Sequence, residues 1–196
     1  MSREDISDKL IHFTTGETLE NAFDRIHTII NKSRLIAGNG FVKGGYRCVC
    51  FPEAPVAALE HGLLNSSAYS RYSPFGIMFE KRWIFEQGGR PVIYQPDSEY
   101  DALPESHKWR HVRYEPNAEE PKDFTWEREW RILTDELNFN ASVAAVVVPD
   151  RDWAERLIAE HESEQDFKTL QYSQIMDEEL ARQYRDKFDW LVYVLR

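Results

Sequence analysis

The sequence predicts a single domain of the α+β class. Its 196 residues include 42% hydrophobic and 13% aromatic side chains, which is enough to build one substantial hydrophobic core. A segment with helical periodicity comes early, and short apolar runs follow it with little regular alternation of strand and helix. This order favours an α+β architecture over a doubly wound parallel sheet.

The composition also excludes several classes of protein. So high an aromatic content is incompatible with a disordered acidic chain. No apolar run approaches the roughly 18 residues of a transmembrane helix, and the charged start, MSREDISDK, lacks the apolar stretch of a secretory signal. Two cysteines are too few for a disulfide framework. We therefore expect a cytoplasmic protein with no membrane partner.

The first elements are expected to be a strand and a helix. Leu10–Phe13 is short and apolar, as in a buried strand. Thr14 follows it, and Glu17 three residues later completes the pattern of a capping box. Apolar residues then recur at helical spacing as far as about Lys32, so we expect a helix from Glu17 onward.

The remaining elements are inferred from apolar runs bounded by glycine and proline. The expected strands are Tyr46–Phe51, Phe75–Glu80, Pro91–Gln95, Glu129–Leu133, Ser142–Val148, Lys168–Tyr172 and Trp190–Leu195. The expected helices are Pro55–Leu64, Arg151–Glu162 and Asp177–Phe188. All belong to one domain, 1–196, with a core at about 10–150 and a C-terminal helix-strand extension, 151–196, packed on that core.

The net charge of −10 is unevenly distributed, because most of the excess acid lies after residue 113. An acidic chain is a poor non-specific binder of nucleic acids and anionic membranes. The segment His107–Arg113 is a local exception, in which Lys108, Arg110 and Arg113 surround a tryptophan. It could hold phosphates and stack a base, or it could be a solvated face whose tryptophan belongs to the core.

Glu127 and Glu129 are the candidate catalytic residues. They stand two residues apart in an expected strand, which would place both carboxylates on one face. Because like charges at that spacing repel, the pair needs an arginine partner or a cationic transition state to stabilise. The alternative is an edge strand whose charges prevent strand-to-strand aggregation.

His12 is the second candidate, because it lies where the first strand leads into the helix. Side chains and amides at such junctions often contact a ligand. The alternative is a structural histidine whose hydrogen bonds are satisfied within the fold.

Metal-binding patterns are weak in this sequence. His107 and His111 stand four residues apart and would share a helix face, but no third ligand accompanies them. Cys48 and Cys50 would share a face of their strand, where buried cysteines are common. We expect no metal site.

Six short motifs follow one another between residues 10 and 150. They are His12-Phe13-Thr14, Val49-Cys50-Phe51-Pro52-Glu53-Ala54-Pro55, Tyr69-Ser70-Arg71-Tyr72-Ser73-Pro74-Phe75-Gly76-Ile77, Pro91-Val92-Ile93-Tyr94, Glu127-Arg128-Glu129-Trp130-Arg131 and Val146-Val147-Val148-Pro149. In order and spacing this set resembles bacterial phage-defence proteins of the AbiGi-like type. More distantly, it resembles the DarT-like branch of the ADP-ribosyltransferase superfamily.

The resemblance implies a curved, split mixed β-sheet of ADP-ribosyltransferase type with flanking helices, which clamps NAD as a co-substrate. It implies that Glu129 is the catalytic glutamate. The residues that it associates with NAD binding are His12, Thr14, Arg47, Phe51, Glu53, Arg71 and Tyr72. Of these, His12 would hold the ribose next to nicotinamide, and Phe51 or Tyr72 would pack against the nicotinamide ring. Arg71, with Arg47 as a second candidate, would contact the pyrophosphate.

Physical chemistry supports the carboxylate roles independently. Cleavage of the nicotinamide N-glycosidic bond builds positive charge on the ribose, which a carboxylate such as Glu129 stabilises. A second carboxylate nearby, such as Glu127, can orient the incoming nucleophile. The resemblance therefore implies an NAD-dependent ADP-ribosyltransferase that modifies nucleic acid or protein. It also implies a toxin or phage-defence effector with an antitoxin or defence protein as a partner. The alternatives are a catalytically inactive antitoxin or sensor module, an NAD hydrolase and an N-glycosidase.

Overall fold

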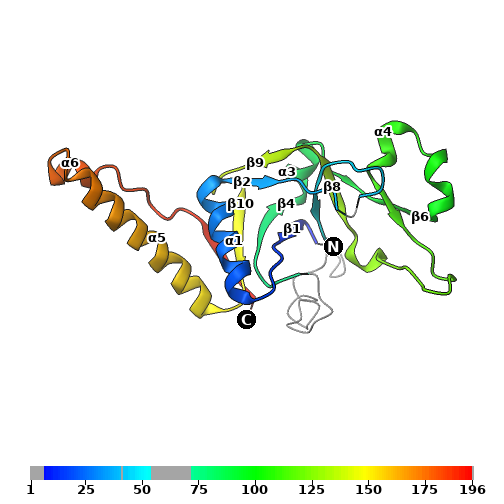
Figure 1. Ribbon diagram of the computed structural model, residues 1–196, viewed down its shortest axis with the longest axis horizontal. Helices are drawn as coiled ribbons and strands as arrows, with labels where there is room; N and C mark the ends of the chain where they lie inside the picture. Colours follow the sequence, from blue (N-terminus) through cyan, green and yellow to red (C-terminus); the bar gives the residue numbers. More distant parts are fainter. Residues whose placement is uncertain (1–6, 41, 54–71, 196) are drawn as a thin grey trace.

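The chain folds into one domain of the α+β class, as the sequence predicts (Figure 1). The computed structural model describes residues 7–40, 42–53 and 72–195. Within these residues the strands form two main sheets and two short ladders, and helices pack at their sides. The expected helix Pro55–Leu64 lies outside the described residues.

The largest sheet has four strands in the order β1-β4-β10-β11. These strands are β1 (Lys9–Phe13), β4 (Gly76–Glu80), β10 (Ala144–Val148) and β11 (Leu191–Val194). β4 runs antiparallel to both β1 and β10, while β10 and β11 are parallel. Gly76 pairs with Phe13, and a Cβ there would lie 2.8 Å from the His12 carbonyl oxygen. Glycine therefore allows β1 and β4 to approach closely beside His12.

The second sheet has the order β3-β8-β5, and all of its strands are antiparallel. It consists of β3 (Cys48–Phe51), β8 (Trp130–Leu133) and β5 (Arg90–Pro91). The structure also contains two separate two-stranded ladders. In one, β2 (Arg34–Ile36) pairs with β9 (Glu136–Asn138), and in the other, β6 (Ile93–Gln95) pairs with β7 (His111–Arg113). The sequence did not predict β2, β7 or β9, because three-residue strands carry little periodic signal.

The main core lies between the two sheets and helix α1 (Leu19–Lys32). Phe23 and Ile26 of α1 pack with Leu10 and Phe79 of the four-stranded sheet and with Phe51 of the second sheet, all at most 1% exposed. Strand alternation gives the other face of β1 a separate, smaller cluster. The amphipathic pattern of α1 therefore determines which face of β1, and hence of His12, turns toward the helix.

The helix begins later than the sequence predicts. Thr18, rather than Thr14, caps α1, because its side-chain oxygen accepts the backbone N–H of Asn21 at 3.1 Å. Thr14 is still tied to the sheet: its backbone N–H donates to the Phe75 carbonyl at 2.8 Å. The prediction was wrong because a local capping pattern carries no information about this tertiary hydrogen bond.

The segment after β4 differs most from the sequence prediction. The residues after β4 form a helix, α3 (Lys81–Glu86), where the sequence indicates only a turn before the next strand. The expected strand Pro91–Gln95 is divided between β5 and β6. A compact lobe follows, with 3₁₀-helix η2 (Asp97–Ala102), helix α4 (Glu105–Lys108) and β7. The sequence predicted that His107 and His111 share a helix face, and this prediction was wrong. His107 lies in α4 and His111 lies in β7.

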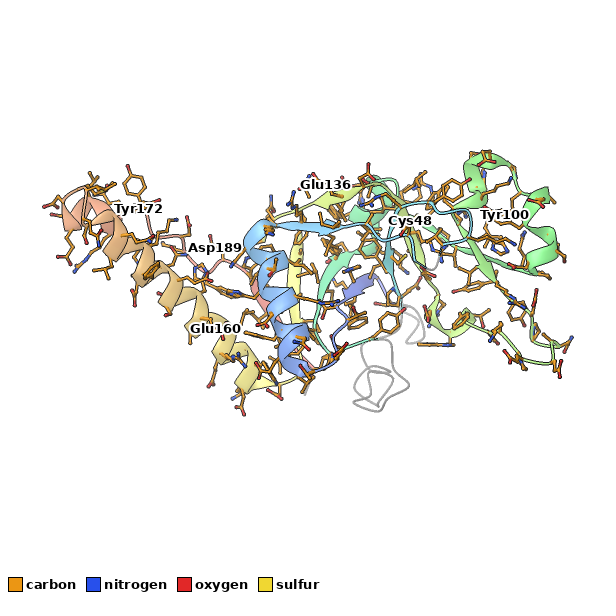
Figure 2. The ribbon with its side chains drawn as sticks, in the orientation of Figure 1. Cys48, Tyr100, Glu136, Glu160, Tyr172 and Asp189 are labelled. Carbon is orange, nitrogen blue, oxygen red and sulfur yellow. The ribbon has the colours of Figure 1, made fainter. Side chains whose placement is uncertain are left out.

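The C-terminal part adds β11 to the sheet and a long helix to the outside. Helix α5 (Arg151–Tyr172) continues through the expected strand Lys168–Tyr172, and the short helix α6 (Glu178–Arg182) follows. Ala154 and Leu157 are buried at the base of α5, and the helix then projects away from the sheets (Figure 1). Figure 2 shows Tyr172 at its far end. The strand prediction was wrong because apolar residues on an exposed helix imitated a strand pattern.

Candidate functional site

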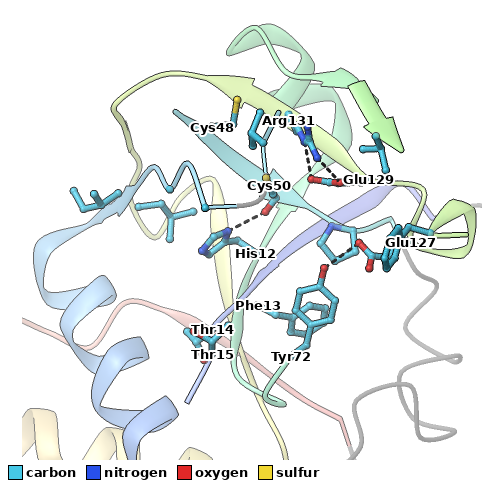
Figure 3. Close-up of a pocket in the computed structure, with 18 of the residues that line it drawn as sticks. His12, Phe13, Thr14, Thr15, Cys48, Cys50, Tyr72, Glu127, Glu129 and Arg131 are labelled. Atoms are coloured by element: carbon cyan, nitrogen blue, oxygen red, sulfur yellow. Dashed lines mark hydrogen bonds and ion pairs between the residues drawn. The ribbon is translucent and has the colours of Figure 1, made fainter. Parts of the chain in front are cut away.

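A large cavity opens between α1, the end of β1, the β3–β8 sheet and the lobe after β6. Its volume is about 1360 Å³, which exceeds the roughly 300–1,000 Å³ of typical ligand pockets. His12, Tyr72, Glu127 and Glu129 all line it, although they come from three separate parts of the chain (Figure 3). The fold therefore brings together five of the nine candidate site residues, since Thr14 also lines the cavity.

His12 is held in one orientation on the cavity wall. Its Nδ1 lies 2.9 Å from the Cys50 carbonyl oxygen, and its ring meets the Phe51 ring edge-on at 5.9 Å. Because a carbonyl can only accept, Nδ1 carries the proton, and Nε2 of the neutral ring is an acceptor. Burial lowers the pKa of His12, and the Cys50 carbonyl opposes this only in part. A neutral imidazole is therefore available to accept a hydrogen bond from a ligand hydroxyl.

Glu129 forms a buried two-pronged ion pair. Arg131 Nε donates to Glu129 Oε1 at 2.8 Å and Arg131 Nη2 donates to Oε2 at 3.1 Å, with the two side chains 5% and 11% exposed. The Glu129 backbone N–H donates to the Tyr94 hydroxyl at 3.1 Å. Burial raises the pKa of Tyr94 to about 12, so the hydroxyl stays protonated. Two explanations were possible for the neighbouring carboxylates, an arginine partner or a cationic transition state. The structure contains the arginine partner, Arg131.

Glu127 is placed differently from the prediction. It ends the 3₁₀-helix η3 (Thr125–Glu127), and Arg128 then takes a left-handed conformation with φ 43° before β8 begins at Trp130. The two glutamates therefore do not alternate along one strand. Glu127 is 6% exposed and accepts a hydrogen bond from the Tyr72 hydroxyl at 3.0 Å. It faces the same cavity as Glu129 from another direction (Figure 3).

Two other implied cofactor residues support the site instead of lining it. Phe51 is 0% exposed in the core, so it backs the His12 ring and leaves no face for nicotinamide. Glu53 is buried, pairs with Lys81 at 2.7 Å and accepts the Trp130 indole N–H at 3.1 Å. The Glu53 backbone N–H also donates to the Glu127 carbonyl at 3.0 Å. Glu53 therefore holds the chain on both sides of Glu129.

The three remaining implied residues have different placements. Thr14 lines the cavity, but its hydroxyl is already hydrogen-bonded to the Ser73 hydroxyl at 2.7 Å and donates to the Phe75 carbonyl oxygen at 3.2 Å. Arg47 lies outside the cavity and pairs with Asp135 at 2.7 Å. Arg71 lies outside the described residues.

The cavity is more cationic than the chain as a whole. Seven Lys or Arg side chains line it against four carboxylates. Five of the seven are already ion-paired: Arg34 with Glu136, Lys43 with Asp97, Arg113 with Glu115, Lys122 with Glu120 and Arg131 with Glu129. Arg25 and Lys32 are among the seven, and their spacing with Ile29 places them on one face of α1. Within the described part of the chain Lys32 has no ion-pair partner, and Arg25 donates only to the Thr15 hydroxyl at 2.7 Å. Sequence reasoning missed both, although the helical period that places them was visible.

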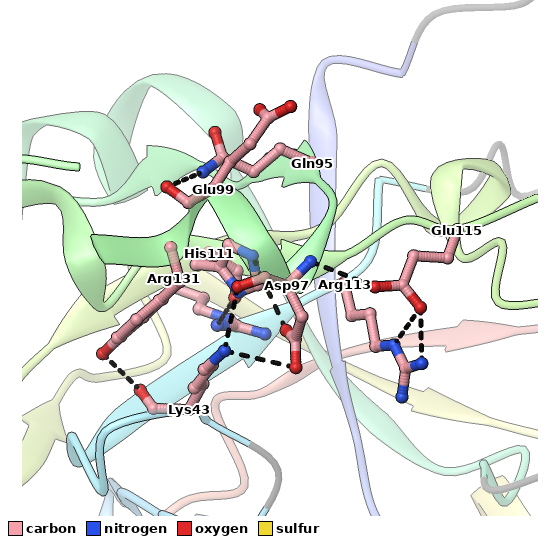
Figure 4. A network of polar contacts seen from close by, with 9 residues as sticks. Lys43, Gln95, Asp97, Glu99, His111, Arg113, Glu115 and Arg131 are labelled. Atoms are coloured by element: carbon pink, nitrogen blue, oxygen red, sulfur yellow. Dashed lines mark hydrogen bonds and ion pairs between the residues drawn. The ribbon is translucent and has the colours of Figure 1, made fainter. Parts of the chain in front are cut away.

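The basic segment His107–Arg113 does not form one phosphate-binding face. Trp109 is buried, Lys108 pairs with Glu105 at 3.1 Å, and the Arg113 guanidinium is held by Glu115. Figure 4 shows the polar network around this segment, in which Lys43 Nζ forms an ion pair with Asp97 Oδ2 at 3.2 Å. These charges are already paired, so the interpretation as a solvated face with a core tryptophan describes the segment better.

The two cysteines are thiols in the cavity wall. Cys48 and Cys50 both line the cavity from β3. Burial raises the pKa of Cys48 to about 11, and burial together with the Glu129 charge raises the pKa of Cys50 well above its ordinary value. Both thiols therefore stay protonated and unreactive at neutral pH. Among the described residues, no group of three or more His, Cys, Asp or Glu side chains is arranged to hold a metal ion.

Comparison of the chain with protein-family models, with curated proteins and with solved structures finds no match. In the described ranges, every helix is too short or too polar to cross a bilayer.

Proposed function

We propose that the protein is an NAD-dependent ADP-ribosyltransferase of the type that the sequence motifs resemble, with its active site in the cavity. The observation that carries this proposal is the convergence of His12, Tyr72, Glu127 and Glu129 on one cavity from three separate segments. Among the described residues, Arg25 and Lys32 are lining cations without a carboxylate partner, and they suit a ligand with two phosphates. The proposal extends to the fold, which we assign to the split-sheet ADP-ribosyltransferase type.

In this proposal NAD lies along the cavity with its nicotinamide end beside Tyr72. The Tyr72 ring, tilted against Phe13 at 5.7 Å, offers the stacking surface that buried Phe51 cannot offer. His12 Nε2 accepts a ribose hydroxyl. Arg25 and Lys32 take the pyrophosphate in place of Arg47.

The reaction breaks the bond between ribose C1′ and the nicotinamide nitrogen, and the bonding electrons neutralise the pyridinium. Glu129 stabilises the positive charge that develops on the ribose. A nucleophile on the acceptor, either nucleic acid or protein, bonds to C1′ and gives its proton to Glu127. No cofactor besides NAD takes part. The biological role that we propose is a toxin or phage-defence effector in the cytoplasm, paired with an antitoxin or defence protein.

A catalytically inactive binding module, serving as antitoxin or sensor, is the second candidate. It is favoured by the Arg131–Glu129 ion pair, because a carboxylate already neutralised by arginine offers less charge to a developing cation. This module would bind NAD in the same cavity without cleaving it.

Labelled NAD distinguishes these functions. Purified protein is incubated with cell lysate and NAD labelled in the adenylate moiety, and the label is followed on protein, on nucleic acid and as free ADP-ribose. A transferase places label on a macromolecule, a hydrolase releases ADP-ribose, and an inactive module binds NAD without product. Glu129→Gln should abolish product formation. Binding without product by the wild-type protein, or full activity of Glu129→Gln, would contradict the proposed transferase site.

A further inference from the structure

All three guanidinium nitrogens of Arg131 donate hydrogen bonds, although the residue lines a cavity. Nε and Nη2 donate to the two oxygens of Glu129, and Nη1 donates to the carbonyl oxygens of Trp109 and His111, each at 3.0 Å. The residue is 4% exposed. One guanidinium group therefore fixes both oxygens of Glu129 and anchors them to the turn between α4 and β7.

The strand register explains how Arg131 reaches these partners. Arg131 lies on the central strand β8, opposite Cys50 on β3 and Arg90 on β5. Glu129 precedes it by two residues, so both side chains point to the same face. The turn at Trp109 and His111 lies above that face and supplies two carbonyl acceptors. These acceptors are neutral, so the single positive charge is balanced by the single carboxylate.

This arrangement differs from an ordinary stabilising ion pair. A buried pair that serves stability alone can be replaced by apolar residues with little loss. Here the carboxylate is turned toward a cavity that also contains His12 and Glu127. A fork with two parallel hydrogen bonds fixes the direction of a carboxylate more tightly than a single bond does.

We propose that Arg131 is a positioning residue, which holds the Glu129 carboxylate at the ribose-binding part of the cavity and ties it to the lobe formed by residues 93–113. The inference rests on the proposed function, since it concerns the carboxylate that we assign to the reaction. It predicts that the geometry of the arginine fork, and not only its charge, determines the rate of NAD cleavage.

Arg131→Lys tests this point, because lysine keeps the positive charge but cannot form the fork. The measurement is nicotinamide release from NAD in the presence of lysate, over a range of NAD concentrations. We expect the maximal rate to fall about 100-fold, as for a small misplacement of a catalytic group. The KM for NAD should stay within about twofold, because an interaction used only in the transition state is lost.

Arg156→Lys is the matched control. Arg156 is also bound to carboxylates, since its Nη1 donates to both oxygens of Glu20 at 2.9 and 2.7 Å and its Nε donates to Glu160 at 2.8 Å, but it lies outside the cavity. This variant should cleave NAD at the wild-type rate. Thermal melting of both variants shows whether they fold, and Glu129→Asp serves as the second test if Arg131→Lys does not fold. Aspartate keeps the charge and retracts the carboxylate by one methylene, so the maximal rate should fall to a similar extent.

The outcomes separate the two proposals. No nicotinamide release by the wild-type protein overturns the proposed function and, with it, this role of Arg131. An active wild-type protein whose Arg131→Lys variant keeps its maximal rate, or loses activity only through a higher KM, overturns the positioning role alone. Wild-type activity of Glu129→Asp overturns it as well.

Discussion

Replacing Glu129 by glutamine should destabilise the fold as well as abolish activity. Glutamine keeps the size of the side chain but removes its charge and turns an amide N–H toward a guanidinium donor. Removing one partner of a buried ion pair costs roughly 3–5 kcal/mol. Arg131 keeps its two carbonyl acceptors, and the amide oxygen keeps one hydrogen bond. We therefore expect the free energy of unfolding to fall by about 2–3 kcal/mol.

The assay is thermal unfolding followed by circular dichroism. For a chain of this length, each 1 kcal/mol corresponds to about 2–4 °C, so Tm should fall by roughly 4–12 °C. Glu136→Gln is the control, because Glu136 pairs with Arg34 at 3.2 Å and both side chains are 42% exposed. An exposed pair of this kind contributes at most about 1 kcal/mol. If Glu129→Gln has the same Tm as this control, the buried ion pair between Glu129 and Arg131 does not exist as described.

A double variant separates the two effects of Glu129→Gln. Glu129→Leu with Arg131→Met removes both charges and leaves apolar side chains of similar length. Replacing both charges is often neutral for stability, but here it also removes the donor to the Trp109 and His111 carbonyl oxygens. The variant should therefore melt below the wild-type protein but remain folded at the assay temperature. It should nevertheless cleave no NAD, so its inactivity cannot be attributed to unfolding. Activity in this folded variant would remove the carboxylate from the mechanism.

Three further measurements test the placements of other residues. Glu53→Gln should lower the free energy of unfolding by about 2 kcal/mol, because it weakens a buried contact with a charged group. NAD binding by the folded variant, measured by calorimetry, should stay unchanged. Weaker NAD binding would support the cofactor-binding role that the resemblance implies for Glu53. The pKa of His12 is lowered by burial, so the unfolded chain takes up the proton first as pH falls below about 6.5. The free energy of unfolding in urea should therefore decline toward pH 5 by at most about 1.4 kcal/mol per pH unit. His12→Gln should flatten that slope, and an unchanged slope would contradict a neutral His12 ring in the folded protein. Arg25→Ala and Lys32→Ala should each weaken NAD binding about tenfold, as expected for loss of a charged hydrogen bond, whereas Arg47→Ala should leave it unchanged; the reverse pattern would place the pyrophosphate elsewhere.

The sequence could predict elements whose pattern is local. The helical period of α1 and the apolar runs of β1, β4 and β10 depend on neighbouring residues, and the structure has these elements close to their expected positions. Thr14 shows the limit of such patterns, because its partners are Ser73 and Phe75, about 60 residues away. A capping motif and a tertiary anchor look alike when only the neighbouring residues are considered.

The candidate site was predictable in its residue types but not in its geometry. Glu127 and Glu129 were assigned to one strand face, and only the left-handed turn at Arg128 separates them. The resemblance implied that Phe51 or Tyr72 packs against nicotinamide, but the packing of β3 against β4 places the Phe51 ring in the core. Arg131 stood in the same motif without a role, since its role depends on the carbonyl groups of a distant turn.

The bulk charge is a poor guide to the ligand because most charges of this protein are paired locally. All of the excess acid follows residue 113, and part of it borders the cavity, where Glu115, Glu120 and Glu136 pair with the lining cations Arg113, Lys122 and Arg34. Such pairs cancel much of the field that a ligand would meet. Among the described residues, Arg25 and Lys32 are the lining cations without a carboxylate partner. A net charge of −10 is therefore compatible with NAD as the substrate if its pyrophosphate lies beside these two side chains, which is the placement that Arg25→Ala and Lys32→Ala test.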